Sequence, residues 1–191
     1  MRIGVLALQG AFAEHSAKLR QLGAEVFEIR QLRDIPESFD GLVLPGGEST
    51  VMRKLLHELG LYEPLKKLIV GGLATFGTCA GMILLADEIE GGEQTCFGTM
   101  NITVKRNAYG RQLGSFRCVD DFAGKNIEMP FIRAPYAEKA GENVQILSVH
   151  EGKIVAVRQE NQLAAAFHPE LTDDTSVYEY FFGMIENREN I

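Results

Sequence analysis

The chain has 191 residues, with 26 acidic and 19 basic side chains and a formal net charge of −7. Hydrophobic residues make up 46% of the chain, which excludes a disordered protein and predicts a single globular domain over residues 1–191. The acidic balance argues against a general nucleic-acid binder, which usually presents a basic face.

The three cysteines indicate a reducing compartment. Cys79, Cys96 and Cys118 are odd in number and lack the C-x-x-C spacing of a metal site, so we expect no disulfide framework and no metal. The apolar run at residues 3–8 is too short to span a membrane, and no signal-peptide cleavage pattern follows it. We therefore expect a cytoplasmic protein that does not bind membranes.

In the first half of the chain, strand-like and helix-like segments alternate. Apolar runs predict strands, and apolar residues at three- and four-residue spacing predict helices. Gly23 is the expected C-cap of the first helix, and Ser49 or Thr50 is the expected N-cap of the second. The expected strands are residues 3–8, 24–29, 41–44 and 73–76, and the expected helices are residues 11–22, 49–59 and 82–85.

The second half is rich in strands and closes with a helix. Its expected strands are residues 100–104, 112–119, 131–133, 144–149, 153–158 and 163–167, and its expected helix is about 175–187. The whole pattern predicts an α/β fold: an open, mostly parallel sheet with helices on both sides, hence three layers, and antiparallel additions.

A cysteine lies between an apolar strand and an apolar helix. Residues 77–81 read Gly-Thr-Cys-Ala-Gly, the strand–turn–helix pattern of a nucleophile elbow. Glycines on both sides of Cys79 permit the strained turn, and a helix N-terminus favours the thiolate. The amide of Ala80 points the same way and is a candidate oxyanion donor. Cys96 and Cys118 lack such a setting and are interpreted as bystanders.

A cysteine nucleophile needs an oriented base, and His168 is the best candidate. It follows an apolar small-residue strand, Pro169 stiffens the chain, and Glu170 can reach the imidazole from the same side of an extended segment. The other histidines, His15, His57 and His150, are interpreted as partly buried or exposed polar residues.

A glycine-rich turn follows the strand at residues 41–44. Residues 45–50 read Pro-Gly-Gly-Glu-Ser-Thr, which lets the backbone approach a ligand, and the Gly47 amide is the expected second oxyanion donor. The turn lacks the Gly-Lys-Ser/Thr ending of a Walker A loop, so phosphate binding is disfavoured.

Together these motifs resemble the class I, or triad, glutamine amidotransferases of flavodoxin-like fold, and among them the glutaminase subunits of pyridoxal 5'-phosphate synthases. The resemblance extends along nearly the whole chain. The segments that carry it are residues 8–15, 45–50, 76–81, 106–112, 131–135 and 167–172, of which 106–112 and 131–135 separate this family from its superfamily.

The resemblance implies hydrolysis of L-glutamine to L-glutamate and ammonia through a thioester. By it, Cys79 is the nucleophile, His168 the base and then the acid, and Glu170 the residue that orients His168. Glutamine would be held by Gly47, Glu48, Ser49, Arg106, Ile132 and Arg133. The chemistry agrees, because arginine matches a carboxylate and an acidic or carbonyl oxygen matches an ammonium group.

The resemblance also implies a partner. Ammonia would pass through an internal channel to a (β/α)₈-barrel synthase subunit, in an assembly of twelve synthase and twelve glutaminase subunits, and docking would activate the glutaminase. The pyridoxal phosphate would be made on the partner, so the chain itself would bind no cofactor.

Two alternatives stay open at this point. The chain could serve another synthase, such as that of histidine or tryptophan biosynthesis, with the same triad. It could instead be a non-catalytic flavodoxin-like module in which Cys79 senses redox state, although a sensor thiol needs no oriented base.

Overall fold

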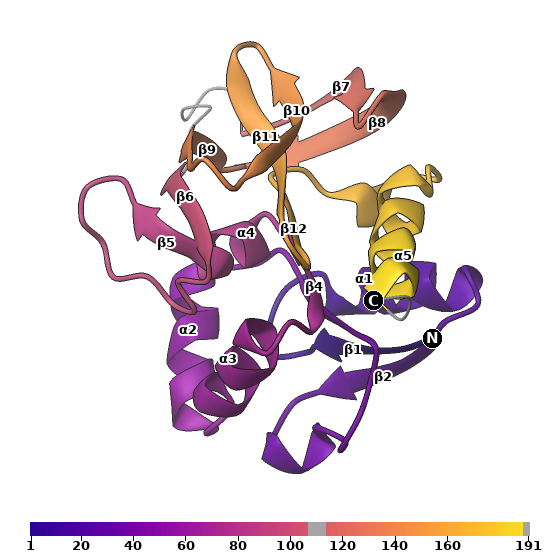
Figure 1. Ribbon diagram of the computed structural model, residues 1–191. Helices are drawn as coiled ribbons and strands as arrows, with labels where there is room; N and C mark the ends of the chain where they lie inside the picture. The colour runs from indigo at the N-terminus through magenta and orange to yellow at the C-terminus, as the bar shows by residue number, and fades with distance from the viewer. Residues whose placement is uncertain (107–113, 189–191) are drawn as a thin grey trace.

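A mixed sheet runs through the centre of the molecule (Figure 1). The computed structural model describes residues 1–106 and 114–188. Five parallel strands form one half of the sheet, in the order β2-β1-β3-β4-β12. Their bounds are β1 Arg2–Leu6, β2 Glu25–Ile29, β3 Gly41–Leu44, β4 Ala74–Thr78 and β12 Gln162–Ala165. The predicted parallel sheet is thus confirmed, with the late strand β12 beside the early strand β4.

Beyond β12 the sheet continues mainly with antiparallel strands. The order is β12-β11-β9-β6-β5, with β10 paired to β11, and only β5 and β6 in this half are parallel. The bounds are β5 Ala86–Ile89, β6 Met100–Lys105, β9 Tyr136–Ala140, β10 Gln145–His150 and β11 Lys153–Gln159. The antiparallel additions are therefore confirmed.

Two strands stand apart as a hairpin. β7 (Ser115–Phe122) and β8 (Lys125–Ile132) pair in antiparallel register as a separate two-stranded sheet. Ala123 and Gly124 both have positive φ in the two-residue turn, as a tight hairpin of matching twist requires. β8 ends at Ile132, and Arg133 follows it directly.

Helices cover both faces of the parallel strands. α1 (Phe12–Gln21) and α5 (Ser176–Arg188) lie on one side, and α2 (Ser49–Glu58) and α3 (Tyr62–Val70) lie on the other (Figure 1). The short helix α4 (Ala80–Leu85) follows β4 directly. None of the described helices is both long and apolar enough to cross a bilayer.

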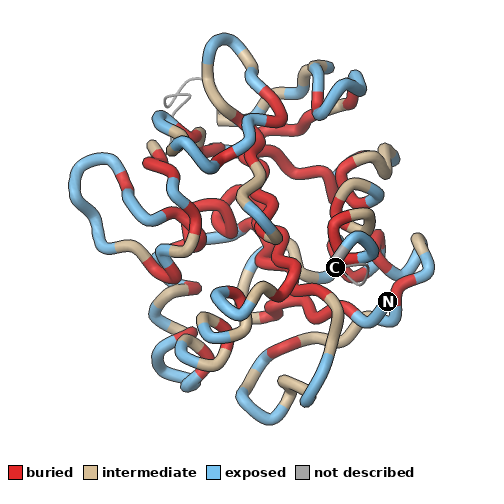
Figure 2. Tube along the Cα trace, viewed as in Figure 1, coloured by how far each residue is buried: buried red, intermediate tan, exposed pale blue. Residues whose placement is uncertain are grey.

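Burial explains why the parallel strands read as unbroken apolar runs. β3 and β4 are buried at every position, since helices cover both of their faces (Figure 2). Phe76 of β4 packs against Phe181 of α5 with ring centroids 5.6 Å apart. The central strands β3 and β4 are thus wholly buried.

Several expectations need correction. α3, β5 and β9 were not predicted, and β8 spans eight residues where three were expected. The N-cap of α2 is Glu48 rather than Ser49 or Thr50, and no side chain caps it. The C-cap of α1 is Leu22 rather than Gly23, which follows it with positive φ. Residues 112 and 113 of one predicted strand lie outside the described residues.

Candidate active site

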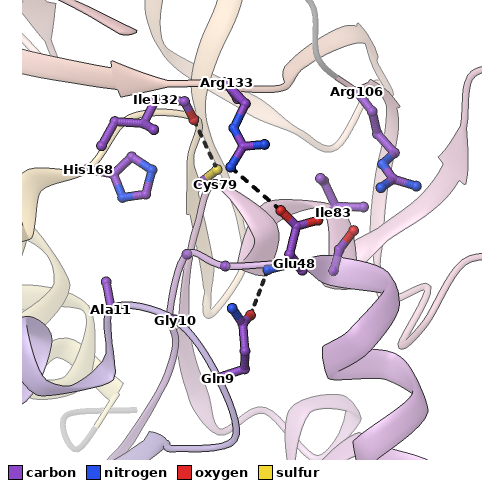
Figure 3. A pocket seen from close by; sticks show the side chains of 13 residues that line it. Gln9, Gly10, Ala11, Glu48, Cys79, Ile83, Arg106, Ile132, Arg133 and His168 are labelled. Carbon is purple, nitrogen blue, oxygen red and sulfur yellow. Dashed lines mark hydrogen bonds and ion pairs between the residues drawn. The ribbon is translucent and has the colours of Figure 1, made fainter. Parts of the chain in front are cut away.

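A cavity of about 350 Å³ opens where the parallel strands end (Figure 3). Segments that follow the carboxyl ends of β1, β3, β4 and β12 meet there, the usual ligand position in open α/β sheets. The lining residues are Gln9, Gly10, Ala11, Gly46, Gly47, Glu48, Ser49, Cys79, Ile83, Arg106, Ile132, Arg133 and His168. Most of the predicted site residues therefore share one cavity, and the exceptions are Ala80 and Glu170.

Cys79 occupies a strained turn between β4 and α4. Its φ of 47° and ψ of −99° place it where L-residues rarely occur. A Cβ on Gly77 would lie 2.7 Å from the Gly81 backbone, and one on Gly81 would collide with the Leu44 carbonyl oxygen. Only glycines can therefore flank this turn, and the sequence interpretation of an elbow is confirmed in its geometry.

His168 and Glu170 meet behind Cys79. The His168 Nδ1–H donates to Glu170 Oε1 over 2.6 Å, and both side chains are almost wholly buried. The segment is not extended as predicted, because Pro169–Leu171 forms a 3₁₀ turn (η2) that curls the carboxylate back to the ring. A Cβ on Gly46 would lie 2.5 Å from His168 Cε1 and 3.4 Å from Cys79 Cβ, so the ring and the cysteine face the same narrow gap.

The titration behaviour of the site suits an ion pair. Burial on its own would lower the pKa of His168, but the Cys79 sulfur and the Glu170 carboxylate outweigh it and raise the pKa to about 10. The ring therefore favours its protonated form, although its Nε2 makes no hydrogen bond within the described residues. By contrast, burial raises the pKa of the Cys96 thiol to about 12 and raises that of Cys118, so both are poor nucleophiles.

The glycine-rich turn at residues 45–50 is held by hydrogen bonds with residues 9–11, which follow β1. The Ala11 amide donates to the Gly46 carbonyl over 3.0 Å, and the Glu48 amide donates to Gln9 Oε1 over 2.7 Å (Figure 3). The Gly47 amide between them has no acceptor within the described parts of the chain. It therefore remains available to a ligand.

Each charged side chain at the cavity mouth has a partner of opposite charge. Arg133, in the left-handed conformation at φ 43°, places its guanidinium 3.8 Å from the Glu48 carboxylate (Figure 3). Arg106 pairs with Glu93, which lies outside the cavity lining. The Ile132 carbonyl oxygen lies 4.0 Å from Cys79 Sγ. A zwitterionic ligand can thus exchange its own charges with a pair that is already in place.

Five cavity-lining residues were not predicted from the sequence, and most of one motif lies outside the described residues. Gln9, Gly10, Ala11, Gly46 and Ile83 line the cavity without having been predicted as site residues. Residues 9–11 belong to a segment that carries the family resemblance, and that signal could have found them. Residues 107–112 of the family-specific segment lie outside the described residues.

His15 was placed wrongly. It was interpreted as a partly buried or exposed polar residue, but its side chain is completely buried and its Nε2 lies 3.4 Å from Glu170 Oε2. The sequence signal that could have found it is the Glu14-His15 pair within the first family segment. His57 is exposed and His150 half-buried, as expected.

This sheet, with a cysteine elbow facing a histidine–glutamate pair, is the architecture of the class I glutamine amidotransferases. A crystal structure of a glutamine amidotransferase matches it with a TM-score of 0.91 and 43% identity, over 96% of this chain and 98% of the other. A crystal structure of a putative GMP synthase component from Thermoplasma acidophilum shares only the fold, with a TM-score of 0.71 and 16% identity over 100% and 96% of the two chains.

The sequence comparison defines the family. The chain belongs to the SNO glutamine amidotransferase family, whose model matches residues 5–187. It is 60% identical to pyridoxal 5'-phosphate synthase subunit PdxT of Methanocorpusculum labreanum, over 97% of this chain and 98% of that one. The subunit of the same name from Streptococcus pneumoniae is 49% identical, over 98% and 100% of the two chains.

Proposed function

We propose that the chain is the glutaminase subunit of a pyridoxal 5'-phosphate synthase and hydrolyses L-glutamine to supply ammonia. The observation that carries the proposal is the meeting of Cys79, His168 and Glu170 beside a cavity, in a chain 60% identical to a subunit of that name. A histidine held as imidazolium beside a thiol supports acyl transfer to sulfur.

Glutamine binds with its side-chain amide toward Cys79 and its α-carbon groups toward the cavity mouth. Arg133 and Arg106 are the cations for the α-carboxylate, and Glu48 is the anion for the α-ammonium. Ser49 and the Ile132 carbonyl supply further polar contacts from the cavity wall. On binding, the Glu48–Arg133 pair is replaced by two pairs with the substrate.

The reaction proceeds in two acyl-transfer steps. The Cys79 thiolate attacks the amide carbon, and the amides of Gly47 and Ala80 hold the resulting oxyanion. The His168 imidazolium gives its proton to the leaving ammonia while Glu170 keeps the ring oriented. Neutral His168 then takes a proton from water, which attacks the thioester and releases glutamate.

The partner is a (β/α)₈-barrel synthase subunit, in an assembly of twelve copies of each chain. The subunit names of the curated relatives support a synthase partner. Ammonia passes to the barrel through a channel, the pyridoxal phosphate is made there, and this chain binds no cofactor. We assign the reaction to the cytoplasm, in keeping with three free cysteines.

A glutaminase assay with and without the barrel subunit tests this function. Glutamate and ammonia are measured for the chain alone, with the pyridoxal 5'-phosphate synthase barrel, and with the corresponding synthase subunits of histidine and tryptophan biosynthesis. We expect little turnover alone and strong stimulation by the first of these partners only. Stimulation by another synthase subunit alone would assign the chain to another synthase.

The same proteins are treated with the glutamine analogue 6-diazo-5-oxo-L-norleucine. We expect a covalent adduct on Cys79, found by peptide mass mapping, and none on Cys96 or Cys118. No adduct and no ammonia with any synthase subunit would reject the glutaminase and favour a redox-sensing role for Cys79.

A further inference from the structure

A buried polar chain extends from Glu170 away from the cavity. His15 of α1 lies with its Nε2 3.4 Å from Glu170 Oε2 and 2.9 Å from Thr78 Oγ1, at the end of β4. On its other side, His15 Nδ1 lies 2.8 Å from the hydroxyl of Tyr178 in α5. His15, Thr78 and Tyr178 are all 0% exposed. Three elements thus meet at one imidazole directly behind the catalytic carboxylate.

The Tyr178 contact indicates which nitrogen of His15 carries the proton. Burial, with the Glu170 charge adding to it, raises the pKa of Tyr178, so its hydroxyl keeps a proton that it can donate to Nδ1. Burial also lowers the pKa of His15, which the Glu170 carboxylate opposes only in part. In the neutral ring of this form the proton is on Nε2, 2.9 Å from Thr78 Oγ1 and 3.4 Å from Glu170 Oε2.

The second oxygen of Glu170 depends on His15 for a polar neighbour. Oε1 accepts from His168, whereas Oε2 is buried and has no hydrogen-bond partner within the described parts of the chain; the polar edge of the His15 ring lies 3.4 Å from it without a hydrogen bond. Burial on its own would raise the pKa of Glu170, whereas His15 and His168 lower it below its usual value. A carboxylate with one free buried oxygen would protonate or rotate.

His15 takes no part in binding the substrate. It is absent from the cavity lining, and Glu170 and His168 separate it from Cys79. The groups that face it are Glu170, His168, Tyr178, Thr78 and, from its own helix, Glu14. Its effect on the reaction must therefore pass through the residues it contacts, Glu170 and Thr78, and the titration of Glu170 separates the two routes.

We propose that His15 is a positioning residue for Glu170: held by Tyr178 at Nδ1 and by Thr78 at Nε2, its ring lies against Oε2 and keeps the carboxylate in place with Oε1 turned to His168. The inference rests on the proposed role of Glu170 in glutamine hydrolysis. It makes α1 and α5 parts of the active centre, although neither touches the ligand through this contact.

The direct test is the titration of Glu170 in the full-length chain. Glutamate is labelled with ¹³C at the side-chain carboxyl, and the Glu170 signal is assigned by its loss in Glu170→Gln. In His15→Phe, which keeps a ring but has no donor, we expect the Glu170 pKa to rise by about one unit or more. In His15→Gln, whose amide can replace Nε2–H, we expect a shift of at most about 0.3 unit.

Two further variants complete the set. His57→Gln is the matched control, since His57 is an exposed histidine of α2 that contacts Tyr62, and it should leave the titration unchanged. Tyr178→Phe removes only the hydroxyl that fixes the ring and should shift Glu170 in the same direction by a smaller amount. Tyr178→Phe decides the matter if His15→Phe does not fold.

The proposal is overturned if the Glu170 pKa in His15→Phe equals that in the parent. If His15→Phe does not fold, the same outcome in Tyr178→Phe overturns it. It is also overturned if His15→Gln shifts the Glu170 pKa as far as His15→Phe does, because the ring would then act only by packing.

In the assembled synthase we expect His15→Phe to lower kcat about tenfold or more with KM unchanged. A shifted titration in a chain without glutaminase activity would reject the proposed function alone.

Discussion

At Cys79, a strained backbone lies next to a histidine of raised pKa. Its positive φ occurs between the buried strand β4 and the buried helix α4, and the His168 ring lies across the same gap. The other two thiols lack both features. The three cysteines are therefore chemically distinct, even though all are free and two of them are buried.

Replacing Cys79 should remove glutaminase activity and little else. In Cys79→Ala we expect ammonia release in the assembled synthase to fall by about 10⁴-fold or more, because no other described group can form the thioester. Cys118→Ala is the control and should retain full activity. Turnover in Cys79→Ala within tenfold of the parent, about 1.4 kcal/mol in barrier, would contradict the assigned nucleophile.

Because of His168, the free energy of unfolding should decrease as the pH becomes alkaline. Its folded pKa of about 10 lies above the usual value of 6.5, so the protonated ring stabilises the fold fully below pH 6.5. That contribution is lost as the pH rises from 6.5 through about 10. In urea denaturation, the stability advantage of the parent over His168→Gln should shrink across this interval. An advantage that is constant from pH 6 to 10, or grows, would contradict the raised pKa.

At the residue scale, the sequence predicts identities better than contacts. Cys79, His168 and Glu170 are recognisable because the residues around them, glycines and a proline, are demanded by local backbone geometry. The pairing of Arg133 with Glu48 is not recognisable, since it depends on where the β7–β8 hairpin ends. His15 is hidden for the same reason: its partners come from β4, η2 and α5.

At the scale of elements, the glycine-rich turn acts as a spacer beside the histidine. A side chain at Gly46 would collide with His168 and approach Cys79, so the absence of a Cβ sets how closely the turn can pass. The turn is also tied to the segment after β1 by two backbone donors. Its position relative to His168 is thus determined by β1 and β3 together.

Gly46→Ala should therefore impair catalysis more than folding. The added methyl group displaces the His168 ring, and we expect kcat in the assembled synthase to fall about 100-fold. Gly183→Ala in α5 is the control: its Cβ meets nothing within 4 Å, so activity should persist and stability should hold or rise slightly. Equal activity in the two variants would show that the turn can yield.

The elements that were not predicted share a weak local signal. α3 carries Pro64 in its first turn, where a helix tolerates proline, and its buried Leu65 and Ile69 follow four-residue spacing. β5 and β9 are short and rich in charged residues, and they are held by pairing with β6 rather than by propensity. The parallel strands were predictable because burial on both faces makes them continuous apolar runs.

At the scale of the whole molecule, the proposed function requires that ammonia released in the cavity reach the partner subunit. The cavity opens at one edge of the sheet, and the antiparallel half and the hairpin surround that edge. Ammonia that escaped there would be protonated in bulk water. A channel into the synthase subunit would prevent this loss.

An isotope competition in the assembled synthase tests this transfer. With glutamine labelled with ¹⁵N at its amide and an excess of unlabelled ammonium, we expect the pyridoxal phosphate nitrogen to come mainly from glutamine. In Cys79→Ala the same product should carry unlabelled nitrogen. Label diluted to the bulk ratio with the parent chain would contradict direct transfer.

The pairing of β4 with β12 has a consequence for synthesis on the ribosome. β4 carries the nucleophile, but β12 and His168 emerge much later, after the entire antiparallel half. Until then the growing chain exposes a bare apolar strand edge that can recruit a chaperone or a wrong strand. During the same interval the thiol has no imidazolium beside it. The nascent chain is thus prone to aggregation and lacks the complete triad, and both conditions end when β12 docks and brings His168 into place.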